Sequence, residues 1–236
     1  MTGFRYDAEV LDRFPTIRAG ILLARGLRSG PTPPGLLEAF RAEQAAVLGR
    51  LRGHPLSEVP SLAAWRRVFR AFGVDPTQTR CAAEALLRRL TKRGDLPSVN
   101  LLVDVGNLVS IRYALPVAVL DLKGIAGGVT VRLARGDEPF TELDSEEVKH
   151  PEPGEVIFVD DDGVVCARRW CWRQSAQSGA GDKTTDALVT VEAHHEAAEA
   201  DVTAALQDLA VLLAEHAGRA ATQVLLSPER PEFREG

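Results

Sequence analysis

The amino-acid sequence predicts an α+β fold in which a mixed or antiparallel sheet is flanked by helices. Three observations support this fold class. Amphipathic helical patterns follow one another in the first part of the chain, and short apolar runs separated by turn residues begin near position 117. One more amphipathic helix comes towards the end. Helices first, strands next and a helix last are typical of α+β domains.

The N-terminal part contains one expected strand and three expected helices. Residues Thr16–Leu27 are rich in Ile and Leu and predict a buried strand. Three later segments have apolar residues at helical period, which predicts amphipathic helices with one face towards the core. Trp65 lies on the second of them and is expected in that core. The three segments are Gly35–Arg52, Ser61–Ala71 and Gln78–Leu90.

Short strands and a last helix are expected in the second half of the chain. Turn residues separate the apolar runs, and Asp162-Gly163 is a hairpin-turn signal between two of them. Residues Glu196–Gly218 predict an amphipathic helix, which a closing strand at Ala221–Leu226 follows. The strands expected before that helix are Val117–Leu120, Val129–Ala134, Val156–Val159, Val164–Arg168 and Ala187–Ala193.

The segment from Val99 to Tyr113 predicts a central helix that is buried on nearly all sides. Ser98 stands where an N-cap is expected, directly before a long apolar run. Asn100, Asp104 and Asn107 recur at helical spacing and share one face of an otherwise apolar helix. Buried polar groups must be satisfied, so this stripe either caps neighbouring loops or lines a cavity.

Composition excludes several classes of protein. None of the apolar runs among the 236 residues reaches the ~18 residues of a membrane span, so we expect a cytoplasmic protein. Three cysteines without metal spacing predict neither a disulfide framework nor a metal site, and we expect no cofactor. The net charge of −5 argues against bulk nucleic-acid binding but allows a local basic patch. One small positive cluster, which suits a helix C-terminus, consists of Arg88, Arg89, Lys92 and Arg93.

The segment Pro97–Asn107, PSVNLLVDVGN, carries a family resemblance together with Leu115-Pro116 and Leu120-Asp121. It resembles the B3/B4 editing module of the bacterial phenylalanyl-tRNA synthetase beta subunit, whose pattern is S-V-N-x-V-V-D-V-T-N … Q-P-x-H-A-F-D. The segment Leu122–Arg132 resembles the continuation of that module, and Glu192 resembles its closing L-E-A. Freestanding B3/B4 proteins are similar over roughly residues 76–195.

The resemblance implies a B3/B4-like fold with a cleft for the aminoacylated 3′ end of a tRNA. We expect an N-terminal strand and helical part packed on the same domain, residues 1–75, and an editing domain, residues 76–226. The last residues, 227–236, are polar and predict a mobile tail. The motif His falls on Ala118 and the motif Thr on Gly106. The small-residue loop of the synthetase is replaced by the bulky segment Arg168–Arg173, so the synthetase specificity is not carried over.

Hydrolysis of an aminoacyl ester needs a positioned water and a stabilised oxyanion more than a strong nucleophile. We therefore expect Asn100, Asp104 and Asn107 to form the catalytic wall of the cleft. Glu192 is expected to bind the α-ammonium group of the substrate. Two cations, Arg173 and Lys183, are expected to contact phosphates, and the rings of Trp170 and Trp172 are expected to stack on adenine. Thr185 and Asp121 are further expected substrate contacts at motif positions.

Structural roles are the alternatives for several of these residues. Glu192 is then an exposed strand end, and Arg173 pairs with Asp104 or Asp121. One of the two tryptophans belongs to the core, because strand alternation places both side chains on one face only if the backbone stays regular. The adjacent His194 and His195 are expected at the surface.

Two main functions remain open from the sequence. The first is a metal-free trans-editing deacylase that hydrolyses mischarged tRNA with positioned water. The second is a non-catalytic module that binds tRNA or an amino acid, which the loss of the motif His at Ala118 favours. A small-molecule hydrolase that reuses the cleft is a third option. Neither the amino acid nor the oligomeric state follows from the sequence.

Overall fold

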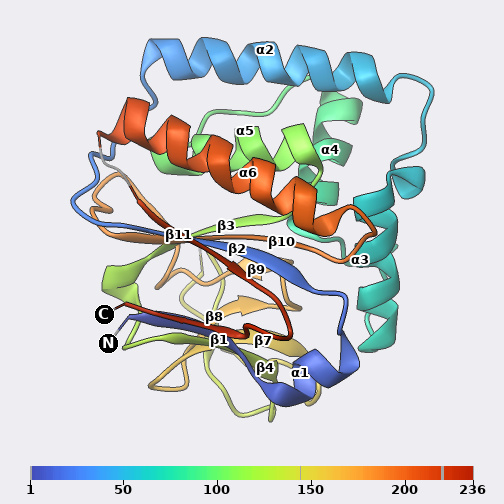
Figure 1. Ribbon diagram of the computed structural model, residues 1–236, viewed down its shortest axis with the longest axis vertical. Helices are drawn as coiled ribbons and strands as arrows, with labels where there is room; N and C mark the ends of the chain where they lie inside the picture. Colours follow the sequence, from blue (N-terminus) through green and yellow to red (C-terminus); the bar gives the residue numbers. More distant parts are fainter. Residues whose placement is uncertain (1, 144, 219–220, 236) are drawn as a thin grey trace.

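The computed structural model describes residues 2–143, 145–218 and 221–235. Two sheets are stacked on each other, and helices cover the outer face of one of them (Figure 1). The helices themselves form two tiers, with α2 (Pro34–Leu51) lying outside α5 (Leu101–Tyr113) and α6 (Ala198–Leu212). The predicted α+β fold class is confirmed.

The four-stranded sheet next to the helices is antiparallel throughout, in the order β11-β2-β10-β3. Its central strand β10 is buried at every residue, because helices cover one face and the second sheet covers the other. Thr190 of β10 pairs with Ala118 of β3, and Val191 pairs with Gly20 of β2. The bounds are Thr222–Leu226 for β11, Arg18–Ala24 for β2, Ala187–Ala193 for β10 and Val117–Asp121 for β3.

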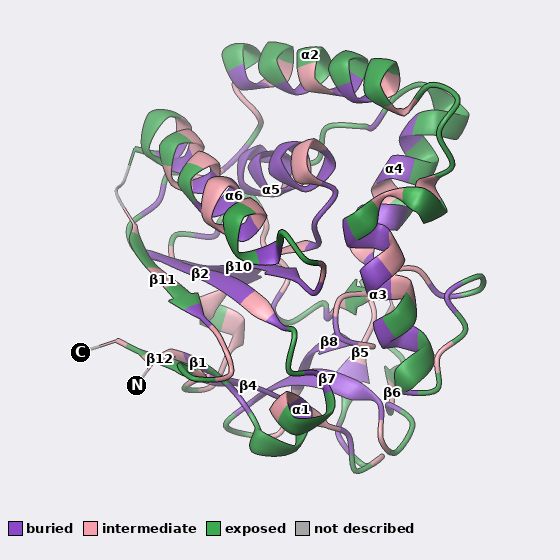
Figure 2. Cartoon of the chain, turned by 45° about the vertical axis from the view of Figure 1, so that its right-hand side comes forward, coloured by how far each residue is buried: buried purple, intermediate pink, exposed green. Residues whose placement is uncertain are grey.

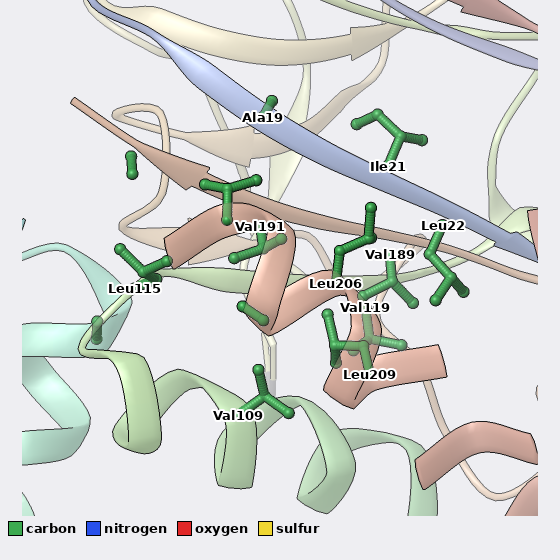
Figure 3. Packing of buried hydrophobic residues seen from close by; sticks show 14 of the residues in the cluster. Ala19, Ile21, Leu22, Val109, Leu115, Val119, Val189, Val191, Leu206 and Leu209 are labelled. Atoms are coloured by element: carbon green, nitrogen blue, oxygen red, sulfur yellow. The ribbon is translucent and has the colours of Figure 1, made fainter. Parts of the chain in front are cut away.

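The core lies where α5 and α6 pack on this sheet (Figure 3). Val109 of α5 and Leu206 of α6 point into it from the helices. Close packing depends on two glycines. A Cβ on Gly20 would lie 2.9 Å from Val191 Cγ1, and one on Gly106 would lie 3.0 Å from Val119 Cγ2. The helices therefore approach the strands more closely than a larger residue would allow.

The second sheet is mixed and six-stranded, in the order β12-β1-β4-β7-β8-β9. Strand β1 (Gly3–Tyr6) is parallel to β4 (Val129–Leu133), and the other pairs are antiparallel. The remaining strands are β7 (Val156–Asp160), β8 (Val165–Arg168), β9 (Arg173–Gln174) and β12 (Glu232–Arg234).

Two expectations about the ends of the described chain need revision. The predicted mobile tail is wrong for residues 232–234, because this segment is β12 and pairs with β1. The pattern of β1 itself is too short to be recognised, although its residues alternate between buried and exposed. The first 75 residues thus contribute strands to both large sheets through β1 and β2.

The other elements surround these layers. Helices α3 and α4 lie at one side of the sheets, and α1 lies at the rim of the six-stranded sheet (Figure 1). Helix α6 continues into a π-helical segment, Leu213–Ala217, and β5 pairs with β6 in a small separate ribbon. The bounds are Ala8–Arg13 for α1, Pro60–Ala71 for α3, Ala82–Arg93 for α4, Phe140–Thr141 for β5 and Val148–Lys149 for β6.

The central helix α5 is buried almost all round, as predicted (Figure 2). Its N-cap is Asn100, whose Oδ1 accepts a hydrogen bond from Val103 N at 3.0 Å, and not Ser98. Asp104 faces inward with no exposed surface. Its carboxylate accepts bonds from Val99 N at 2.9 Å, Thr32 Oγ1 at 2.6 Å and the Ser98 hydroxyl. Asp104 therefore closes the helix start and cannot face a ligand.

Replacing Asp104 by Ala should destabilise the fold by about 3 kcal/mol, because three donors lose a buried charged acceptor. Urea unfolding of the variant and the wild type measures the difference. The matched control is Asn107→Ala on the same helix, whose half-buried side chain makes no hydrogen bond to a described residue. Equal losses in the two variants would contradict the capping role of Asp104.

Candidate functional site

A small pocket of about 90 Å³ lies where the start of β3, the second half of β10 and the segment that joins β8 to β9 meet. Its walls are mainly apolar, and most of its polar side chains come from β9 and β10. The lining residues are Ala82, Pro116, Val117, Ala118, Phe158, Ala167, Trp170, Cys171, Trp172, Arg173, Gln174, Thr190 and Glu192.

Glu192 is the buried acid of this pocket, with 2% of its surface exposed. It lies two residues after Thr190 on β10, so strand alternation turns both side chains to the same face. One carboxylate oxygen, Oε1, accepts hydrogen bonds from Trp170 Nε1 at 2.9 Å and from the Tyr6 hydroxyl. The other oxygen, Oε2, accepts none from the part of the chain that the structure describes. The pocket thus holds a carboxylate with one oxygen left for a ligand.

Burial raises the pKa of Glu192 to about 7, while the hydrogen bonds from Trp170 and Tyr6 act in the opposite direction. The pKa of the Tyr6 hydroxyl is raised well above 10, first by burial and then by the nearby carboxylate. Tyr6 therefore stays protonated and donates to Glu192 at neutral pH. A carboxyl group with a pKa near 7 in a pocket is a common property of functional sites.

The segment that joins β8 to β9 has an unusual backbone. Arg169 and Trp170 have φ values of 46° and 62°, in the left-handed region that side chains other than glycine rarely adopt. Buried Glu155 holds this turn, because it accepts two bonds from the Arg168 guanidinium at 2.9 and 2.8 Å and one from Arg169 N at 2.9 Å. The strained turn aims Trp170 at Glu192.

The two tryptophans have different environments, because the backbone at Arg169 and Trp170 departs from a regular strand. Trp170 is fully buried and packs edge-on against Trp65 and Phe14, with ring centroids 5.4 and 5.2 Å away. Trp172 is half-buried at the pocket and lies 4.5 Å from the Arg169 guanidinium carbon and 4.8 Å from that of Arg173. Its ring is thus already engaged by two cations.

Arg173 is exposed and donates to Glu142 Oε2 at 2.9 Å. The alternative pairing of Arg173 with Asp104 or Asp121 is therefore wrong. Asp121 instead accepts bonds from Thr184 Oγ1 at 2.6 Å and Lys123 N at 2.9 Å.

Cys171 also lines the pocket, but its thiol is not activated. Burial and the neighbouring Cys81 thiol raise the pKa of Cys171 well above its ordinary value. Thiolates, and not thiols, are the nucleophilic form of cysteine. Covalent catalysis by Cys171 is therefore disfavoured at neutral pH.

Only part of the expected site comes together at the pocket. Glu192, Arg173, Trp170 and Trp172 all line it, as do Cys171 and Ala118, the latter at the place of the motif His. The expected catalytic wall is elsewhere, because Asn100 and Asp104 cap α5. Six of the expected residues do not line the pocket, namely Asn100, Asp104, Asn107, Asp121, Lys183 and Thr185.

The remaining expectations are corrected by burial. Glu192 is not an exposed strand end. His194 is buried among aromatic rings, and burial lowers its pKa to about 3, so it is neutral. His195 is also largely covered, with its Nε2 2.8 Å from Asp201 Oδ2. Neither histidine is the surface residue that was expected.

Sequence reasoning missed Tyr6, Gln174 and Thr190. Tyr6 lies far from the motif, and its only signal is the alternation Phe4-Arg5-Tyr6 in a strand too short to recognise. Thr190 stands at the same face as Glu192 two residues earlier, so the strand period alone pointed to it. Gln174 donates to Val119 O at 3.0 Å, which joins β9 to β3 beside the pocket.

Comparison with known protein families shows which family this chain belongs to. A family model described as the B3/4 domain matches residues 64–218, well over half of the chain. The chain belongs to the B3/4 domain family. The predicted resemblance is thereby confirmed. All residues that line the pocket fall within the matched range, whereas Tyr6, which donates to Glu192 from β1, lies outside it.

Individual relatives of this B3/4 protein are phenylalanine–tRNA ligase beta subunits. That of Nocardia farcinica is 32% identical over 169 residues, which are 71% of this chain and 19% of the relative. That of Shewanella oneidensis is 28% identical over 116 residues, which are 49% of this chain and 14% of the relative. The chain thus spans under a fifth of the length of these relatives.

Among solved structures, an N-terminal fragment of the phenylalanyl-tRNA synthetase beta subunit from Pyrococcus horikoshii is similar, with a TM-score of 0.48 and 13% identity. The similarity covers 94% of this chain and 50% of that one.

Two kinds of feature, a membrane-spanning helix and a metal-ligand cluster, are absent from the described residues. Among them, no helix has the length and apolar character needed to cross a bilayer. Residues 2–143, 145–218 and 221–235 also contain no group of three or more His, Cys, Asp or Glu side chains placed to hold a metal ion.

The raised pKa of Glu192 makes the stability of the fold depend on pH. Its ordinary value is 4.5 and its folded value is about 7, so the folded state holds the proton more tightly. The resulting stabilisation is complete below about pH 4.5 and is lost as the pH rises through 7. Relative to Glu192→Gln, the wild type should lose about 3 kcal/mol of unfolding free energy between pH 4.5 and 7. Urea titrations at both pH values measure this, and a constant difference would contradict it.

Proposed function

We propose that this B3/4 protein is a trans-editing deacylase that hydrolyses the ester of a mischarged tRNA. Family membership and the relatives named as phenylalanine–tRNA ligase beta subunits support a role connected with tRNA. The proposal depends above all on one observation, which is the free oxygen of the buried Glu192 carboxylate in a mainly apolar pocket.

The size of the pocket limits which part of the substrate enters it. About 90 Å³ is far below the roughly 300–1,000 Å³ of pockets that enclose whole small-molecule ligands. A terminal adenosine therefore lies outside, and the amino acid enters. Arg169 and Arg173 stand at the ring of Trp172, which lines the pocket, and offer guanidinium planes on which a base stacks.

The chemistry of the pocket suits a charged amine. The ammonium group of an aminoacyl ester donates hydrogen bonds to Glu192 Oε2, and its positive charge favours ionisation of that carboxylate. The protonated Cys171 thiol is a poor nucleophile, so the attacking group is a bound water. Its oxygen bonds to the ester carbonyl carbon, the bond from that carbon to the ribose oxygen breaks, and a proton of the water passes to the ribose oxygen. Holding ester and water together supplies most of the acceleration, since the ester is already activated.

Hydrolysis of a panel of mischarged tRNAs by the purified protein tests this proposal. At least one aminoacyl ester should be cleaved, with the same rate in the presence of EDTA. Glu192→Gln should lower kcat/KM about 100-fold, because a charged group in a buried site loses its partner. The matched control is Glu196→Gln, an exposed residue beyond β10. If none of the mischarged tRNAs is hydrolysed, the proposed deacylase activity is refuted.

The rate should also depend on pH. Only ionised Glu192 pairs with the ammonium group, and its pKa is about 7. We therefore expect kcat/KM of the wild type to rise as the pH passes through 7. The Glu192→Gln variant should lack that rise, and an identical profile in both proteins would remove Glu192 from substrate binding.

A non-catalytic module that binds tRNA or an amino acid is the second candidate. It is favoured by Ala118, which lines the pocket at the place of the motif His. Binding of aminoacylated tRNA without turnover by any member of the panel would select this function over the first.

A further inference from the structure

Helix α4 connects the pocket with a group of free cations. Its first residue, Ala82, lines the pocket and donates its backbone N–H to Cys171 O at 2.8 Å. Its last turns carry Arg88, Arg89, Lys92 and Arg93, all of them exposed. None of these four cations forms an ion pair with any residue that the structure describes. They stand out in a chain with a net charge of −5.

The helical period sorts these cations into two pairs. At about 100° per residue, Ala82, Arg89 and Arg93 lie within about 40° of one another on the helix surface. Arg88 and Lys92 lie about 80° to 120° away from Ala82. Only the first pair, Arg89 and Arg93, is on the stripe of α4 that starts at the pocket.

The distance along this stripe matches a short polynucleotide strand. With a rise of about 1.5 Å per residue, Arg89 and Arg93 lie roughly 10 and 16 Å along the axis from Ala82. Phosphates follow one another about every 3.4 Å along one strand of a stacked helix. The cations are therefore in register with the first few phosphates of a strand whose end is at the pocket.

We infer that the stripe from Ala82 to Arg93 binds the single-stranded 3′ end of the RNA substrate, with Arg89 and Arg93 on its phosphates. The inference rests on the proposed function, because it places the 3′ terminus at the pocket. Arg173 lines the pocket at the start of this path, and α4 guides the strand away from it. An unpaired strand fits better than a duplex, since one narrow line of charge faces one backbone.

Binding of a fluorescently labelled single-stranded RNA oligonucleotide tests the inference without any hydrolysis. In the wild type, log Kd should depend steeply on log salt concentration. The double variant Arg89→Gln/Arg93→Gln should make this slope shallower by about 1.4, because each phosphate contact to a single strand contributes about 0.7. The slope for Arg88→Gln/Lys92→Gln should stay at the wild-type value.

The second double variant is a close control. It removes the same number of charges from the same helix end, so it has the same effect on the helix dipole and on net charge. Thermal unfolding of both variants verifies that α4 is intact. Equal slopes in the two variants would overturn the inference, and so would an acidic peptide that competes as well as RNA.

A second measurement separates this inference from the proposed function. If the protein deacylates tRNA, Arg89→Gln/Arg93→Gln should raise KM for tRNA and leave kcat unchanged. The same variant should cleave an aminoacyl ester of adenosine, which has no phosphates, at the wild-type kcat/KM. An unchanged KM for tRNA would refute the role of α4 and leave the deacylase intact. If no mischarged tRNA is hydrolysed but the salt slopes are as predicted, the deacylase is refuted and the role of α4 stands.

Discussion

One carboxylate oxygen joins the two large sheets of this protein. Glu192 belongs to the four-stranded sheet, Tyr6 to the six-stranded sheet, and Trp170 to the segment between two strands of that second sheet. Both donors meet at Oε1 of Glu192. Because a buried carboxylate without partners is costly, the sheets must stay in the relative position that keeps these two bonds. The pocket lies beside these two hydrogen bonds, where the two sheets meet at Glu192.

The same constraint explains why the turn at Arg169 and Trp170 is strained. An unfavourable backbone persists only where its surroundings over-determine it. Here Glu155 holds the turn from one side with three hydrogen bonds, and Glu192 holds the indole of Trp170 from the other. Two buried acids thus keep a bulky segment in place, where the synthetase motif has small residues. The pocket is narrow for this reason, because Trp170, Cys171 and Trp172 of this segment line it.

Much of the fold was predictable, because it depends on local patterns. The expected segments of α2, α3, α5 and β10 match the structure closely, since each is long enough to show its period. The site was less predictable. Asn100, Asp104 and Asn107 have the spacing of a common face, but Asp104 turns to the backbone N–H of Val99 and two hydroxyl groups. Residue spacing shows which side chains share a face of the helix but does not show which groups pack against that face.

The sequence by itself determined the α+β class, the buried central helix and the relationship to the B3/4 domain, because periodicity and motif are properties of consecutive residues. It also pointed to Glu192 through the motif. Only the tertiary structure decided that Glu192 is buried, that Tyr6 from the far end of the chain completes its environment, and that α4 begins at the pocket. Those facts depend on contacts between residues distant in sequence, whose desolvation and hydrogen bonds arise only when the two sheets pack together.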